Sequence, residues 1–132
     1  LQLQLPDGRC LKGFGVVVSN CRFYGGRYMV TPAASMFKDD LEVCLLCQGS
    51  RAALLRFALS LALKRPLRAP LVELLTVDEI SLKGDGVAIQ VDGDDFGTLP
   101  VLIEVVPRAI TMMLPGDSFT ERTVDVDSQV TR

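Results

Sequence analysis

The stretch Leu41-Glu42-Val43-Cys44-Leu45-Leu46-Cys47-Gln48 decides the fold of this sequence. Its apolar residues are interrupted by one charged side chain only, which is the pattern of a strand with both faces buried. Gly49 and Ser50 then end the strand, and Ser50 is suited to cap the N-terminus of a following helix. The sequence therefore predicts a central strand followed directly by a helix.

Alternating apolar residues and turn residues recur about every ten positions on both sides of this strand. The pattern predicts short antiparallel strands, and such a set suits a sandwich. We expect a mainly β fold: an antiparallel β-sandwich with one amphipathic α-helix at about residues 51–64, in one domain over residues 1–115. For residues 116–132 we expect an edge strand or a tail. The predicted strands are residues 1–5, 16–19, 27–31, 41–48, 71–77, 79–83, 87–92, 101–106 and 109–114.

The predicted helix combines a broad apolar surface with a narrow polar stripe. The apolar residues are Leu54, Phe57, Ala58 and Leu61, with Leu55, Leu59 and Ala62 widening that side. The polar stripe contains Arg56, Ser60 and Lys64. This pattern favours a helix packed on the sheet, and a face that meets lipid or a partner is the alternative. Basic residues at the end of the helix, Lys64, Arg65 and Arg68, suit either the helix dipole or an anionic membrane surface.

The composition excludes several classes of function. The chain has 132 residues, with 14 Lys and Arg against 16 Asp and Glu, and it has no basic stripe, which argues against a nucleic-acid partner. The absence of histidine excludes imidazole catalysis and imidazole metal ligands. No apolar run approaches the roughly 20 residues that cross a bilayer. The opening residues 1–5 lack a Met and the features of a signal peptide, so we expect part of a longer, cytoplasmic chain.

Four cysteines occur, and two of them form the spacing Cys44-Leu45-Leu46-Cys47. This spacing matches a zinc knuckle or a redox pair. However, the pair lies inside an apolar strand, where residues three apart point to opposite faces. We therefore expect Cys44 and Cys47 to act as small buried hydrophobic residues, with metal binding or a disulfide as the alternative.

Two segments contain residues that could carry chemistry. The turn Asp92-Gly93-Asp94-Asp95 crowds three carboxylates, which suits general-base or Mg²⁺ chemistry, although Asp and Gly also form ordinary acidic hairpins. In the segment from Asn20 to Arg27, Gly25-Gly26 permits close backbone approach, and arginines there could hold a phosphate. No glycine-rich nucleotide motif is present, so the chain is not expected to bind a nucleoside triphosphate unaided.

Five short motifs follow one another in a distinctive order. They are Asn20 with Gly25-Gly26, then Pro32-Ala33-Ala34, then Leu41-Glu42-Val43, then Asp92-Gly93-Asp94 with Gly97 and Pro100, and finally the segment from Ile103 to Ala109 with Leu114-Pro115. In this order they resemble the C-terminal β-sandwich domain of the soluble lipid kinases, over roughly residues 6–115. That superfamily contains bacterial diacylglycerol kinases and eukaryotic sphingosine and ceramide kinases, with NAD kinases as more distant relatives.

The resemblance implies ATP-dependent phosphorylation of a hydroxyl of diacylglycerol or a related sphingoid lipid. The acid of the family's Asp-Gly-Glu motif maps onto Asp94, the implied general base, with Asp92 supporting the turn. Asn20, Gly25 and Gly26 map onto positions near an interdomain cleft. ATP and Mg²⁺ are implied as cofactors held mainly by an N-terminal nucleotide-binding domain of the same chain, without which this fragment is expected to be inactive. The other implied partners are the lipid and a peripheral membrane surface, and a homodimer is left open.

The chain departs from the family pattern at two positions. Asp94 replaces the usual Glu, so the carboxylate reaches about 1.3 Å less far. Lys38-Asp39 occupies the place of an acidic-Gly turn that helps to bind a structural Mg²⁺ in bacterial members. We therefore expect no firm metal ligand, with Asp39 as the candidate. The alternative to a kinase is a non-catalytic β-sandwich module that binds a lipid or a protein, and an activity like that of NAD kinases is a third option.

Overall fold

Strand β6 (Leu41–Leu46) lies at the centre of a three-stranded antiparallel sheet, between β3 (Gly15–Ser19) and β7 (Val72–Val77). The computed structural model describes residues 1–111 and residue 113. Along β6, Val43 belongs to one hydrophobic cluster, whereas the next residue, Cys44, belongs to another. The strand is thus buried on both faces, as its apolar composition predicts.

A second antiparallel sheet has four strands. In spatial order they are β11 (Val101–Glu104), β8 (Glu79–Lys83), β1 (Gln2–Gln4) and β2 (Cys10–Lys12). A turn at Pro6-Asp7-Gly8 leads from β1 toward β2.

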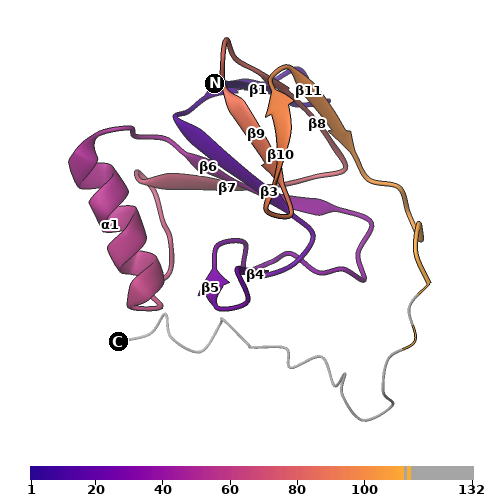
Figure 1. Ribbon diagram of the computed structural model, residues 1–132, viewed down its shortest axis with the longest axis horizontal. Helices are drawn as coiled ribbons and strands as arrows, with labels where there is room; N and C mark the ends of the chain where they lie inside the picture. The colour runs from indigo at the N-terminus through magenta and orange to yellow at the C-terminus, as the bar shows by residue number, and fades with distance from the viewer. Residues whose placement is uncertain (112, 114–132) are drawn as a thin grey trace.

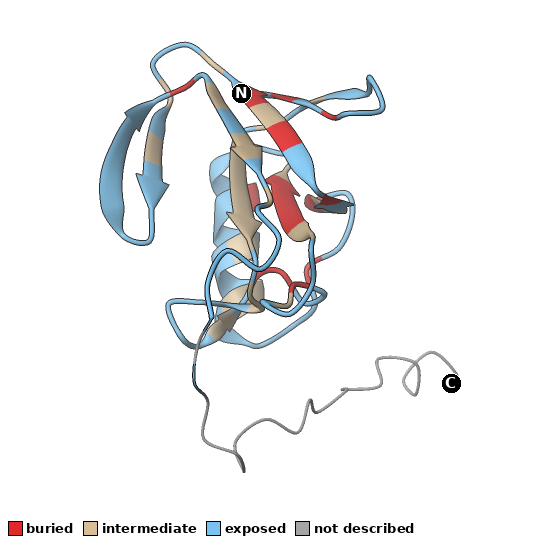
Figure 2. Ribbon diagram, turned by 90° about the vertical axis from the view of Figure 1, so that its right-hand side faces the viewer, coloured by how far each residue is buried: buried red, intermediate tan, exposed pale blue. Residues whose placement is uncertain are grey.

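The main core lies between these two sheets. Leu3, Ile80 and Leu82 from the four-stranded sheet share a cluster with Val43 and Leu45 from the three-stranded sheet. Figure 2 shows buried residues on the central strands and exposed residues on the outer hairpins and loops. Because one core is built from the facing sides of two sheets, the predicted antiparallel β-sandwich is confirmed.

Helix α1 (Arg51–Ala62) forms a third layer beside the three-stranded sheet (Figure 1). The Oγ of Ser50 accepts a hydrogen bond from the Ala53 amide at 3.1 Å, so Ser50 is the N-cap that the sequence predicts. The helix ends at residue 62 rather than 64, because Lys64 adopts a left-handed φ of 54° and closes the helix.

The inner face of α1 differs from the predicted one. Ala53, Phe57 and Leu61 contact the second cluster, which contains Cys44 and Val72, whereas Leu54 and Ala58 are exposed. The residues that face the sheet are spaced four apart, starting at Ala53, and therefore lie on one side of the helix. The small Ala53 side chain lets the helix approach the sheet closely, so the packed face is centred on the 53–57–61 row.

Two hairpins complete the described structure. One pairs β4 (Phe23–Tyr24) with β5 (Tyr28–Met29), and the other pairs β9 (Ala88–Val91) with β10 (Asp94–Thr98). Strands β2, β4 and β10 were not predicted, and β5 is shorter than the predicted strand 27–31.

The predicted strand at 109–114 is wrong for residues 109–111, which contain no strand. The last rung is the hydrogen bond from the Val105 amide to the Asp78 carbonyl, after which Pro107 and Arg108, with a φ of 54°, turn the chain away. Residues 112 and 114, and the segment 116–132 for which a tail or edge strand is expected, lie outside the described residues. Within the described part, no helix is long and apolar enough to cross a membrane.

Candidate functional site

Asp94 lies at the free end of the β9–β10 hairpin. Val91 pairs with Asp94, so Asp92 and Gly93 form a two-residue loop, and both have positive φ, 51° and 104°. This is the left-handed geometry that two-residue hairpin loops prefer, and Asp followed by Gly is a sequence that adopts it with little strain. Asp94, the candidate base, is thus the first residue after the two-residue turn.

The three carboxylates of this turn have different surroundings. Asp95 Oδ1 accepts a hydrogen bond from the Gly97 amide at 3.0 Å, across a bulge in which the pairing register shifts between Asp95 and Gly97. In the part of the chain that the structure describes, the side chains of Asp92 and Asp94 have no hydrogen-bond or ion-pair partner. Asp95 therefore holds the bulge, and Asp94 is free to bind a group from outside this domain.

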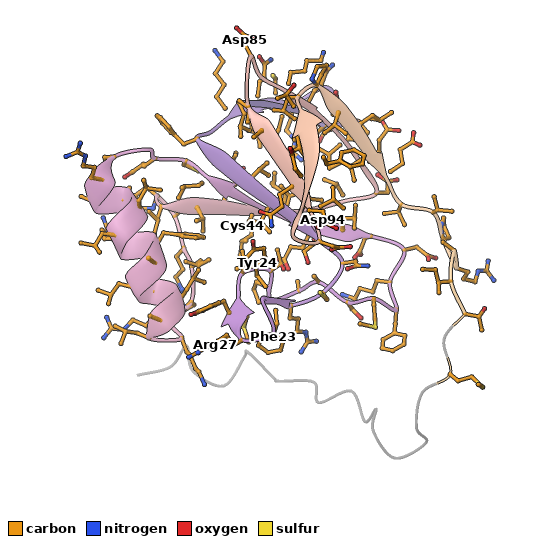
Figure 3. The ribbon with its side chains drawn as sticks, viewed as in Figure 1. Phe23, Tyr24, Arg27, Cys44, Asp85 and Asp94 are labelled. Carbon is orange, nitrogen blue, oxygen red and sulfur yellow. The ribbon has the colours of Figure 1, made fainter. Side chains whose placement is uncertain are left out.

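The hairpin is exposed except at Ile89 of β9, which is half-buried and packs against the sandwich core. Every residue of β10 is exposed, including Phe96 with 63% of its surface accessible. Figure 2 shows the hairpin, at the left, standing away from the rest of the molecule, and Figure 3 shows Asp94 at its free end. A carboxylate in open solvent is a poor general base, because catalytic charges act most strongly where water is excluded. Asp94 thus requires a second surface over it to become a catalytic group.

Asn20 lies in the loop that follows β3. The Ser19 hydroxyl accepts a hydrogen bond from the Cys21 amide at 3.1 Å and donates one to the Cys21 carbonyl at 2.8 Å. The buried Thr31 hydroxyl donates to the same carbonyl at 2.9 Å. These bonds fix the backbone on either side of Asn20, whose own side chain is exposed. The loop is therefore a rigid support for an exposed amide.

Gly25 and Gly26 connect β4 to β5. Their φ values are 57° and 74°, and a Cβ added at either position would meet nothing within 4 Å. Within this domain they are thus required for the sign of φ rather than for close packing. The Arg27 guanidinium lies 5.2 Å from the centre of the Tyr28 ring, a cation–π contact on the same turn.

Among the described residues, no hydrogen bond or ion pair joins Asp94 to the Gly25-Gly26 turn. The two hairpins form separate two-stranded sheets, so no ladder of backbone hydrogen bonds fixes one relative to the other. Asn20 lies on neither hairpin. The grouping of these residues around a single cleft therefore stays a prediction.

Glu42 is a buried carboxylate that the sequence did not single out. Only 4% of the residue is accessible, and Glu42 Oε2 accepts hydrogen bonds from the amides of Ala33, at 2.6 Å, and Ala34, at 2.8 Å. Burial raises the pKa of the Glu42 carboxyl, and the two amide hydrogen bonds partly oppose the rise. The signal in the sequence was a single acidic residue inside an otherwise apolar strand.

The loop that Glu42 holds contains Asp39, the candidate metal ligand. Lys38 and Asp39 are exposed, and the Lys38 ammonium lies 3.5 Å from the Ala33 carbonyl. In residues 1–111 and 113, no three His, Cys, Asp or Glu side chains gather closely enough to hold a metal ion. Mg²⁺ commonly takes one or two protein carboxylates and completes its octahedron with water, so Asp39 stays a candidate ligand.

Cys44 and Cys47 behave as packing residues. Cys44 lies in the helix-side cluster and Cys47 packs against the sandwich core, on the opposite face of the sheet, and both thiols are free. Burial, reinforced by the nearby Glu42 and Cys47, raises the pKa of the Cys44 thiol to about 11. Burial also raises the pKa of the Cys47 thiol. Thiols in this state are weak nucleophiles, so the pair is poorly suited to redox chemistry.

Comparison with known protein families finds one that matches most of the chain. The model of the YegS C-terminal NAD kinase beta sandwich-like domain matches residues 6–114, a span that includes the three-stranded sheet, the helix, both hairpins and every strand of the four-stranded sheet except β1. No curated protein matches the chain. A match over this span, together with the sandwich described above, shows that the chain belongs to the family of C-terminal β-sandwich domains of YegS-like kinases, which are related to NAD kinases and to diacylglycerol kinase-like lipid kinases.

Proposed function

We propose that this domain is the lipid-side part of an ATP-dependent lipid kinase that phosphorylates a hydroxyl of diacylglycerol or a related sphingoid lipid at the cytoplasmic membrane surface. The observation that carries the proposal is the Asp94 carboxylate. It lies directly after a two-residue turn at the end of an exposed hairpin, and its side chain has no partner among the described residues. Membership of a kinase-like family supports the assignment.

In the proposed reaction, the lipid hydroxyl donates a hydrogen bond to Asp94. As the hydroxyl oxygen forms its bond to the γ-phosphorus of ATP, the bond from that phosphorus to the β–γ bridging oxygen breaks and ADP leaves. The O–H bond breaks as well, and Asp94 accepts the proton. Asp92 and Gly93 hold the carboxylate at the tip of the hairpin, and the hydrogen bond from Gly97 to Asp95 holds the bulge beside it. Positioning supplies much of the rate in phosphoryl transfer, so a rigid turn is a useful support.

The nucleotide requires groups that this domain lacks. No glycine-rich phosphate-binding motif occurs in the chain, and in its described residues no three His, Cys, Asp or Glu side chains gather closely enough to hold a metal ion. ATP and Mg²⁺ would therefore be held mainly by a nucleotide-binding domain that covers the hairpin, with Mg²⁺ neutralising the phosphate charge. That domain would also provide the second surface that excludes water from Asp94.

A phosphoryl-transfer assay tests the proposal. The whole protein would be incubated with Mg-ATP and mixed micelles of diacylglycerol, monoacylglycerol, sphingosine or ceramide, comparing wild type with Asp94→Asn. We expect product with wild type and a loss of about two to four orders of magnitude in the variant. Asp85→Asn is the matched control, because Asp85 also lies in an exposed turn, far from Asp94 in Figure 3, and this variant should keep full activity.

Two other outcomes would correct the proposal. Equal activity in wild type and Asp94→Asn would retain the kinase and dismiss Asp94 as its base. No product on any lipid, with ATP bound and the fold intact, would favour a non-catalytic module that binds a lipid or a protein. Asp94 in place of the family's Glu, and Lys38 in place of an acidic residue, are the observations that favour this second candidate.

A further inference from the structure

Helix α1 and the segment that follows it carry positive charge only. Between Val43 and Val72 the chain contains five basic residues and no Asp or Glu, although the whole chain has a formal net charge of −2. The five residues are Arg51, Arg56, Lys64, Arg65 and Arg68, and all are exposed. In the part of the chain that the structure describes, none of them forms an ion pair. This part of the surface is therefore a cationic region without ion pairs among the described residues.

The same helix has a leucine-rich outer face. Leu55 and Leu59 lie one turn apart, opposite the packed row that begins at Ala53, and they are 69% and 53% accessible. Leu54 and Leu63 are also about half accessible, at 49% and 52%. Figure 1 shows α1 at the left edge of the molecule, with both sheets on its other side. The fold therefore buries one side of α1 and leaves the opposite, apolar side uncovered.

We propose that this leucine face, with its basic border, docks the domain onto an anionic lipid surface. Helices that lie in the membrane interface combine an apolar face with Lys and Arg at its edges, so that leucines enter the acyl boundary while cations meet the headgroups. The positive charges of this region attract anionic headgroups, gain no net Coulomb attraction to a neutral surface and are repelled by a cationic one. The helix lies parallel to the membrane in this arrangement and does not cross it.

The composition of the face favours lipid over protein as the occupant. Its central residues are Ala52, Leu55, Leu59 and Ala62, none of which is aromatic or able to form a side-chain hydrogen bond. Binding energy in protein interfaces is concentrated in Trp, Tyr and Arg, with leucine under-represented, and a typical interface also carries about ten hydrogen bonds. A fluid lipid surface needs neither feature.

Vesicle co-sedimentation without ATP tests this inference independently of the proposed phosphoryl transfer. The protein is mixed with vesicles of phosphatidylcholine alone, or of phosphatidylcholine with phosphatidylglycerol. We expect binding to the anionic vesicles that weakens with added salt. Leu59→Gln should reduce the partition coefficient by roughly tenfold, because a half-exposed apolar side chain no longer enters the lipid. Arg56→Glu should reduce it by at least about tenfold.

Matched controls distinguish the helix from general surface effects. Leu102→Gln replaces a leucine of nearly equal accessibility, 54%, on β11, and Lys12→Glu makes the same type of charge reversal on β2. Both controls should bind anionic vesicles within about twofold of wild type. Circular dichroism checks that each variant is folded.

Three results would overturn the inference. They are no binding of wild type to anionic vesicles, full binding by both helix variants, and equal losses in the controls. A helix variant that abolished self-association while wild type ignored vesicles would identify a protein-binding face instead. The vesicle assay contains no nucleotide, so a lack of vesicle binding would not contradict the proposed kinase activity. A lack of kinase product would likewise not contradict membrane docking.

Discussion

Glu42 and Asp94 are carboxylates with opposite surroundings, and those surroundings suit them to different roles. Glu42 is buried and accepts two backbone amides, so it joins the central strand to the loop at residues 33–34. Asp94 is exposed and has no side-chain partner in the described residues. A buried, hydrogen-bonded carboxylate holds structure, whereas an unpartnered one at a hairpin tip is available to a substrate.

Substitution of Glu42 should separate its hydrogen bonds from its charge. Glu42→Ala leaves the Ala33 and Ala34 amides without their acceptor, and we expect the free energy of unfolding to fall by about 2 kcal/mol. Glu42→Gln keeps an acceptor oxygen and removes the charge that burial disfavours, so its stability at pH 7 should stay within about 1 kcal/mol of wild type. Urea denaturation followed by circular dichroism measures both.

The pH dependence of Glu42 has a definite sign. Because the pKa of Glu42 is higher in the folded state than the ordinary value of 4.5, the folded protein binds more protons in the window above 4.5. The Glu42 contribution to stability therefore falls as pH rises through this window. Wild type should gain stability relative to Glu42→Gln when the pH is lowered from 7 toward 4.5. A difference that is constant, or that changes in the other direction, would contradict this explanation.

At the scale of elements, the sequence predicted best where burial alone decides the structure. Strand β6 and helix α1 were predicted because continuous apolar residues and the Ser50 cap act locally. Strand β10 was missed because Asp and Gly, which are depleted in strands, make up three of its five residues, and its pairing follows from the Asp92-Gly93 turn. The candidate site was predicted residue by residue, but its assembly depends on hairpins whose relative placement no local pattern encodes.

The C-terminus of α1 offers a test at this scale. The amides of Lys64 and Arg65 donate to the Leu61 carbonyl, at 3.1 Å, and the Ser60 carbonyl, at 2.8 Å, the pattern of a Schellman motif. Lys64 occupies the left-handed position, where a side chain is strained and glycine is not. We expect Lys64→Gly to raise the free energy of unfolding by about 1 kcal/mol in urea denaturation. Lys64→Ala also removes the charge but keeps the β-carbon, so an equal gain there would contradict the explanation.

At the scale of the whole molecule, the three-stranded sheet belongs to two cores at once. Its inner face contributes Val43 and Leu45 to the sandwich core, and its other face contributes Cys44 and Val72 to the helix-side cluster. Opening either core exposes one face of the three-stranded sheet. Unfolding of that sheet would disrupt both cores, because each core contains its side chains. We therefore expect the two sheets and the helix to unfold as one cooperative unit.

Cys44 reports on this cooperativity, because its side chain lies between the sheet and the helix. The residue is 2% accessible, and burial raises its thiol pKa to about 11, so both access and ionisation oppose its reaction with an alkylating reagent. The exposed Cys10 serves as the internal control. At pH 8 we expect Cys44 to be labelled at least about a thousandfold more slowly than Cys10, since a stable domain is rarely unfolded.

With increasing urea, peptide mass spectrometry should show Cys44 becoming reactive at the midpoint measured by circular dichroism. Labelling of Cys44 well below that midpoint would mean that the helix layer opens alone, and the three layers would then be two cooperative units rather than one.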